Sequence, residues 1–332
     1  MKFGPVPLKD ALGAILAHSQ ALPGGRMRKG THLGEAEIAR LADAGLREVV
    51  VARLETGDID EDAAAEMIGR ALVRDEAGQG LRLSRAATGR INLHATVPGI
   101  LDFDPASVVR LNLVDPTITF ACLPHLARVE PGVMAGTVKI IPYGIARTAA
   151  ARAAAAGAVL RVRRASIASA TLIETVAAAE SQEGTSEKGE AAIRARLERL
   201  GVRLDEVVRV PHRTDALAAA IQVAAGGLVL VLTASATSDP SDVGPEGLRR
   251  AGGRVTRVGL PVDPGNLLFL GALGNRPVIG MPGCVRSLAP NGADLVLERV
   301  VCGISLTEAE IAAMAVGGLL KETKARGRPR EG

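Results

Sequence analysis

Residues 228–242 read Leu-Val-Leu-Val-Leu-Thr-Ala-Ser-Ala-Thr-Ser-Asp-Pro-Ser-Asp, an uncharged apolar run followed directly by a polar loop. A continuous apolar run of this length is typical of a strand buried on both faces, as in a parallel sheet. Upstream, Leu217, Ile221 and Ala224 repeat at helical spacing. We therefore interpret the uncharged stretch 216–238 as a helix, a turn and a central strand, and not as a membrane span.

The same alternation extends to both sides of this central strand. Further apolar runs of strand length predict strands at residues 171–176, 206–210, 254–258 and 277–280. Capping residues place helices between the first four strands, with starts at Ser186, at Thr214 and near Pro245, and later helices from Asn291 to about Gly303 and from Thr307 to Leu320. Strands that alternate with amphipathic helices predict an α/β fold, a three-layer α/β/α domain with a mostly parallel sheet.

The N-terminal part has a different sequence pattern. An apolar-periodic segment at 8–16 predicts a helix, and Asp60 is placed as the N-cap of a later one. Short β-rich runs separated by prolines predict a β-containing part near 89–145. We place the main boundary at the alanine-rich run after residue 147. The expected organisation is an N-terminal α+β region at 1–150, the α/β domain at 151–320 and a basic, disordered tail at 321–332.

Composition limits the function classes. The chain has 332 residues, 47% of them hydrophobic, which excludes a disordered protein. Its net charge of +4 is spread along the chain and only 2% of residues are aromatic, so we expect no nucleic-acid binding. Three widely spaced cysteines and five histidines without metal-ligand spacing predict neither disulfides nor a zinc site. No secretory signal pattern is visible at the start, and we expect a cytoplasmic protein.

Ligands of open parallel sheets bind beyond the carboxyl ends of the strands, where loops and helix N-termini converge. The first loop, residues 233–242, holds five hydroxyls and two carboxylates in ten positions. Such a loop at a helix start predicts an anion site. Asp242 is the candidate for a catalytic role, and Asp242, or alternatively Asp239, is the candidate for holding a divalent cation. The ligand-binding candidates are Thr233, Ser235, Thr237, Ser238 and Asp239. The alternative interpretation, that these residues are turn formers and a helix cap, stays open.

Two further loops combine proline and glycine with polar tips. They are the second loop, residues 261–266, and the third loop, residues 281–287. Glycine lets the backbone approach a ligand closely, and the guanidinium of Arg286 suits phosphate. The candidates are Asp263, Pro264, Gly265, Asn266, Pro282, Gly283, Cys284, Arg286 and Ser287. Two ordinary turns are the alternative, and we interpret Cys284 as lining the site because no histidine base is assigned to it.

These loop sequences resemble a known family. Residues 172–303 are similar to the molybdopterin-binding domain of molybdopterin adenylyltransferases and molybdotransferases, through residues 234–237, 261–268 and 280–287. Residues 13–19, 29–31 and 54–64 are similar to a bacterial branch of that family, some of whose members are fused to a nucleotidyltransferase domain. The resemblance implies a molybdopterin-binding type of fold, molybdopterin as ligand, magnesium and molybdate as further cofactors, and a homo-oligomer.

The chain departs from the catalytic members at two places. Ala234 and Ser235 stand where those members have a glycine pair, and Thr175 is followed by Val176 and not by a glycine. Added Cβ atoms narrow a pocket and restrict φ. Two interpretations remain. The chain is a transferase in molybdenum-cofactor biosynthesis, acting at the phosphate or inserting molybdate, or a non-catalytic carrier that passes the cofactor to a nucleotidyltransferase or an apo-molybdoenzyme. A general nucleotide-binding protein is a third possibility.

Overall fold

The computed structural model describes residues 1–157, 159–177 and 183–320, and they form two compact units. The first unit contains residues 1–97 and 101–163, and the second contains residues 98–100 and the chain from Arg164 onward. The predicted tail, residues 321–332, lies outside the described residues.

The first unit is an α+β region, as predicted. Its elements are β1 (Lys2–Pro7), a 3-10 turn (Leu8–Asp10), β2 (Ile15–Leu16), β3 (Gln20–Leu22), β4 (Gly25–Met27), α1 (Glu35–Asp43), β5 (Glu48–Arg53), β6 (Asp58–Asp60), α2 (Glu61–Leu72), α3 (Glu76–Gln79), β7 (Leu81–Leu83), β8 (Arg90–Ala95), β9 (Gly99–Asp102), α4 (Pro105–Asn112), β10 (Ile118–Cys122), β11 (Arg128–Val129), β12 (Met134–Ile140), β13 (Gly144–Ala146), α5 (Arg147–Ala156) and β14 (Arg161–Arg163). The part predicted to be β-rich, near 89–145, contains β8 to β13.

The prediction of a helix at residues 8–16 is wrong. Its residues form the 3-10 turn and β2, because Gly13 has a φ of +75°, which interrupts a right-handed helix. Leu16 instead pairs with Val51 of β5. The predicted cap is confirmed, since the Asp60 carboxylate accepts a hydrogen bond from Ala63 N–H at the start of α2.

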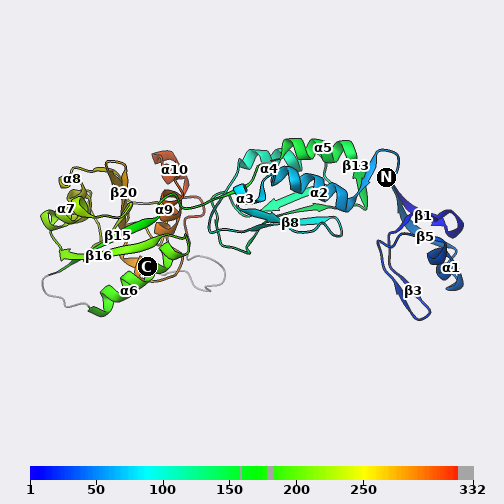
Figure 1. The fold of residues 1–332 in the computed structure, drawn as a ribbon, viewed down its shortest axis with the longest axis horizontal. Coiled ribbons are helices and arrows are strands. Elements are labelled where there is room, and N and C mark those ends of the chain that lie inside the picture. Colours follow the sequence, from blue (N-terminus) through cyan, green and yellow to red (C-terminus); the bar gives the residue numbers. More distant parts are fainter. Residues whose placement is uncertain (158, 178–182, 321–332) are drawn as a thin grey trace. The chain divides into compact units, whose positions relative to one another are not determined.

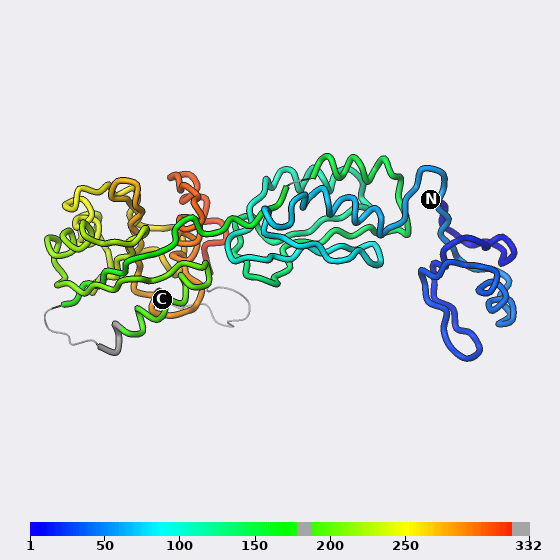
Figure 2. The backbone as a smooth tube through the Cα atoms, viewed as in Figure 1, coloured from blue at the N-terminus to red at the C-terminus, as the bar shows by residue number. Residues whose placement is uncertain are grey.

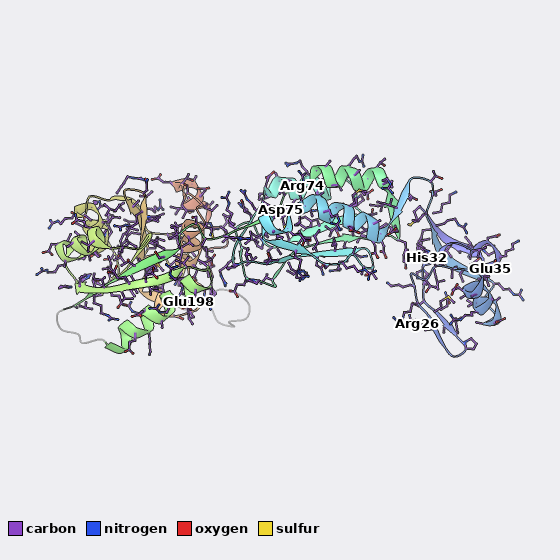
Figure 3. The ribbon with its side chains drawn as sticks, viewed as in Figure 1. Arg26, His32, Glu35, Arg74, Asp75 and Glu198 are labelled. Carbon is purple, nitrogen blue, oxygen red and sulfur yellow. The ribbon has the colours of Figure 1, made fainter. Side chains whose placement is uncertain are left out.

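The boundary between the units lies at Arg163/Arg164, and therefore later than the predicted boundary at 150/151. The reason is packing. Ala149, Ala150 and Ala153 of α5 lie in the same buried cluster as Leu72 of α2. Gln79 joins the two ends of this segment. Its side-chain oxygen accepts hydrogen bonds from the backbone N–H groups of Arg74 and Asp75, which are labelled in Figure 3. Its side-chain nitrogen donates to the carbonyls of Leu72 and Leu160. The alanine-rich helix and the strand after it are thus built into the first unit.

The second unit contains the mostly parallel sheet and its helices (Figure 1). Its elements are β15 (Ser169–Val176), α6 (Glu183–Glu198), β16 (Arg203–Pro211), α7 (Thr214–Val223), β17 (Leu228–Leu232), α8 (Val243–Arg250), β18 (Arg254–Val258), β19 (Phe269–Leu273), β20 (Arg276–Met281), a 3-10 turn (Gly283–Arg286), α9 (Gly292–Val301) and α10 (Glu308–Ala313). Figure 2 follows this backbone from green at β15 to red at α10.

The six strands lie in the order β16-β15-β17-β20-β19-β18. Strands β16, β15, β17 and β20 are parallel, whereas β19 is antiparallel to both of its neighbours. All five predicted strands are present, and β19 was missed. It is a short run with Gly271 at its centre, and it pairs across a tight turn with β20 rather than through a helical crossover.

Helices cover both faces of this sheet. Leu217 and Ile221 of α7 and Leu248 of α8 share one buried cluster with Val229 and Val231 of β17. The alternate residues of the strands, such as Leu172, Leu230 and Ile279, are fully buried on the opposite face, where α9 contacts β20. The prediction of a three-layer α/β/α fold is confirmed.

The last predicted helix is shorter than expected. The Thr307–Glu310 capping box is present, but α10 ends at Ala313 and not at Leu320. Gly317 has a φ of +83°, and the backbone of Gly318 and Leu320 is hydrogen-bonded to that of Asp263. Among the described residues no helix has the length and apolarity that crossing a bilayer requires.

Candidate functional site

The three predicted loops leave the sheet at one edge. Strands β15, β16, β17 and β20 are parallel, and β18 has the same direction because two antiparallel pairings separate it from β20. In the register of the sheet, Leu232 pairs with Glu174 on one side and with Met281 on the other. We call this the carboxyl edge. It carries the first loop after β17, the second after β18 and the third after β20.

The first loop is folded tightly on its own polar groups. The Thr233 hydroxyl donates to the Ser235 carbonyl (2.6 Å), and the Ser241 N–H donates to Asp239 (2.8 Å). Thr233 and Thr237 are buried. The side chains of Ser235, Ser238 and Asp239 are exposed and available to a ligand.

Asp242 caps α8. Its carboxylate accepts hydrogen bonds from the backbone N–H groups of Ser238 and Val243, both at 3.0 Å. The Ser238 N–H is the largest cause of a lowered pKa of Asp242, and His212 nearby adds to the lowering. The side chain is therefore ionised at neutral pH.

Asp242 is the predicted magnesium ligand. In residues 1–157, 159–177 and 183–320, no three His, Cys, Asp or Glu side chains are grouped so that they could hold a metal ion. Both Asp242 oxygens are engaged in capping. Magnesium at Asp242 stays a prediction, because one or two carboxylates together with substrate phosphates are the usual ligands of that ion.

Thr175 and His212 join the first loop to the neighbouring strand ends, and the sequence did not mark His212 as part of the site. The Thr175 hydroxyl oxygen accepts a hydrogen bond from Ala234 N–H (2.9 Å) and lies 2.8 Å from His212 Nδ1. These residues end β15 and follow β16. The only available signal was their position directly at predicted strand ends.

The second loop is held from two sides. The Asp263 N–H donates to Gly318 O (2.8 Å), and the Leu320 N–H donates to Asp263 O (2.9 Å), so the backbone of Asp263 is used in chain pairing. The Asp263–Pro264 peptide is cis, Pro264 is buried and Asn266 is exposed.

The second and third loops meet at the start of α9. Gly292 N–H donates to Pro264 O (2.7 Å). Gly265 has a φ of +127°, and a Cβ there would lie 2.7 Å from Asn291 Oδ1. The Asn291 amide in turn donates to Cys284 Sγ (2.9 Å). The structure thus brings the second and third loops together, whereas no hydrogen bond between described residues joins them to the first loop.

Arg286 is the cation of the third loop. Its stem packs beside α6, where a Cβ added to Gly189 would lie 3.7 Å from Arg286 Cγ. Its Nε is buried and has no hydrogen-bond partner among the described residues. Gly283, Cys284 and Ser287 are exposed around it, and Pro282 is buried. A guanidinium with an unfilled donor at a strand-end edge suits an anionic group.

Two segments of the chain match known protein families. Residues 172–301 match the family described as "Probable molybdopterin binding domain", and residues 5–53 match "Domain of unknown function (DUF8806)". No curated protein sequence matches the chain significantly.

Two solved structures are similar at low identity. The molybdopterin biosynthesis MoeA protein of Pyrococcus horikosii shares 14% identity, with 90% of this chain and 75% of that chain covered and a TM-score of 0.32. A molybdenum cofactor biosynthesis protein of Pyrococcus furiosus shares 13%, with 96% of this chain covered and a TM-score of 0.23; the match spans 65%, just under two thirds, of that protein. Both scores are low, so the assignment depends on the family match. Residues 172–301, which carry all three loops, match the molybdopterin-binding domain family.

Proposed function

We propose that the second unit binds molybdopterin at the carboxyl edge and that the chain acts in molybdenum-cofactor biosynthesis. The observation that carries the proposal is the Arg286 guanidinium, which has a buried and unpartnered Nε and lies on one of the three loops of a molybdopterin-binding domain. The side chain as a whole is half-buried and cationic, and so it suits the phosphate of a phosphorylated pterin.

We assign the phosphate and the pterin ring of the ligand to different loops. Arg286, with exposed backbone at Gly283 and Cys284, suits the phosphate. Exposed hydroxyl and amide groups at Ser235, Ser238 and Asn266 suit the polar edge of a pterin. Thr233 and Thr237 are buried under the first loop and help to keep its backbone folded.

We propose a carrier rather than a transferase. Ala234 and Ser235 replace a glycine pair, and Ala234 is fixed by its hydrogen bond to Thr175. Both Asp242 oxygens accept backbone hydrogen bonds, and Asp239 accepts one from the Ser241 N–H, so both carboxylates of the first loop help to hold its backbone. The carrier would pass the cofactor to a nucleotidyltransferase or an apo-molybdoenzyme.

The test begins with the full chain purified from a host that makes molybdopterin. Iodine oxidation converts bound molybdopterin to a fluorescent pterin, and the chain has no tryptophan and one tyrosine, so its own fluorescence interferes little. We expect close to one pterin per chain, and none from a host unable to make it. An absence of pterin from both preparations contradicts the proposal.

A second assay separates carrier from transferase. The loaded chain is incubated with ATP and magnesium, or with molybdate, and the released products are measured. Bound pterin without turnover supports the carrier. Adenylylated or molybdenum-loaded product shows that the chain is a transferase.

A further inference from the structure

Arg196 is a buried arginine on α6, and only 3% of its side chain is exposed. An arginine side chain stays charged and carries five N–H donors, so burial requires acceptors for all of them. Among the described residues its guanidinium has five acceptors: Ala192 O (3.2 Å), Val285 O (2.8 Å), Ser287 O (2.7 Å), Ala289 O (3.3 Å) and Asp294 Oδ1 (2.6 Å).

Three of these acceptors belong to the third loop and the residues after it. Val285 and Ser287 are the neighbours of Arg286 on its two sides. Arg196 therefore holds the peptide group before Arg286, through Val285 O, and the peptide group that follows Ser287, through Ser287 O. The peptide group between them is held by the Ser287 N–H, which donates to Cys284 O. Because the backbone is fixed on both sides, the direction in which the Arg286 side chain leaves the loop is fixed as well.

Of the two other bonds, the one to Ala192 O stays within α6, and the one to Asp294 extends the network to the second loop. Asp294, which accepts from Arg196 Nε, also accepts from Asn291 N–H (2.9 Å). The Asn291 side chain donates to Cys284 Sγ, and the next residue, Gly292, donates to Pro264 O. One chain of hydrogen bonds thus runs from Arg196 through the start of α9 into both loops.

We propose that Arg196 is the positioning residue of the molybdopterin site: it orders the third loop so that Arg286 is presented to the phosphate. The inference rests on the function proposed above. The stability of the fold does not require a buried charge at this position, because apolar side chains of similar volume often replace a buried ion pair without loss of folding stability. What an apolar residue cannot supply is the set of donors to three carbonyls in and after the third loop and to the Asp294 carboxylate at the start of α9.

The test compares two arginines of the second unit. Arg196→Lys keeps the charge but not the planar fork. Arg276→Lys is the matched control, since Arg276 also donates to two carbonyls, those of Ile221 and Ala224, but lies at the start of β20, at the other end of the strand from the third loop. Each full-length variant is titrated anaerobically with molybdopterin extracted from a molybdoenzyme.

A second readout is the rate at which a thiol reagent labels Cys284, measured by peptide mass spectrometry. The Cys284 thiol suits this measurement because it is exposed and lies in the third loop.

We expect Arg196→Lys to weaken molybdopterin binding by about tenfold or more and to raise the Cys284 labelling rate severalfold. Arg276→Lys should lower the thermal midpoint comparably and leave both readouts within about twofold of wild type. Equal affinities and equal labelling rates for wild type and Arg196→Lys overturn the inference, as does an identical loss in both variants.

If Arg196→Lys does not fold, Asp294→Asn takes its place, since it weakens the charged acceptor of Arg196 Nε and keeps an oxygen for Asn291. It should change both readouts in the same direction, and unchanged readouts overturn the inference. A wild-type chain that binds no molybdopterin overturns the proposed function instead. The Cys284 comparison then decides by itself whether Arg196 orders the loop.

Discussion

The Thr175 hydroxyl oxygen accepts a hydrogen bond from the backbone N–H of Ala234, 2.9 Å away. This bond ties the first loop to the end of the neighbouring strand, and the same oxygen lies 2.8 Å from His212 Nδ1. A side chain that is only 4% exposed thus holds together the ends of β15, β16 and β17.

Replacing Thr175 with valine should loosen the first loop. The Thr175→Val side chain has nearly the same shape but no acceptor, so the Ala234 N–H loses its partner at a cost of about 1–2 kcal/mol. We expect that loss in the free energy of unfolding, measured by urea titration, together with weaker molybdopterin binding. Thr175→Ser, which retains the hydroxyl, should stay near wild type. Equal stabilities of the valine and serine variants would argue against the bond.

Gly265 should tolerate no side chain. At a φ of +127°, a Cβ would lie 2.6 Å from Gly292 N and 2.7 Å from Asn291 Oδ1. Gly265→Ala should therefore destabilise the second unit by about 2–4 kcal/mol, from backbone strain and the clash together. Gly274→Ala is the control, because Gly274 has a φ of +60° with nothing within 4 Å, and it should cost only about 1 kcal/mol. Urea unfolding of both variants measures the difference, and similar losses would mean that the contact with α9 is unimportant.

Asp242 should contribute stability that depends on pH. Its pKa in the folded chain is lowered from an ordinary value of 3.8, chiefly by the Ser238 N–H. Its contribution is therefore present above the unfolded-state pKa and is lost as the pH falls through the lower folded-state value. Asp242→Ala should reduce the free energy of unfolding at pH 7 by about 1 kcal/mol, the usual value of an N-cap, with the difference from wild type shrinking in acid.

The control for Asp242 is asparagine, which caps a helix without titrating over this range. Asp242→Asn should stay close to wild-type stability at pH 7 and show a flatter acid limb. A wild-type curve with the same pH slope as the asparagine curve would exclude a stabilising ionised Asp242.

Local patterns predicted much of this fold. The bounds of β17 and β18 coincide with the predicted runs, and the caps at Asp60, Asn291 and Thr307 are present. These features depend on neighbouring residues, whose spacing is visible in the chain. The strand β19 and the turn at Gly13 were missed because a short glycine-containing run and a single positive φ leave almost no periodic signal.

The partners within the site could not be predicted in the same way. Thr175 bonds to a residue 59 positions away, and Arg196 bonds to Ser287 across 91 positions. Such pairs depend on the strand order, in which β17 lies beside β20 although β18 and β19 come between them in the chain. The sequence predicted that the loops share an edge, but not which side chains hold them there.

The most direct test of the central claim is anaerobic calorimetric titration of molybdopterin into the full chain, its Arg286→Met variant and an Arg254→Met control. Arg254 is an exposed cation at the start of β18, at the other end of that strand from the second loop. We predict one molybdopterin per wild-type chain, binding about 10–100-fold weaker in Arg286→Met, and unchanged binding in Arg254→Met. A wild-type chain that does not bind, or an Arg286→Met variant that binds as well as wild type, would contradict the account.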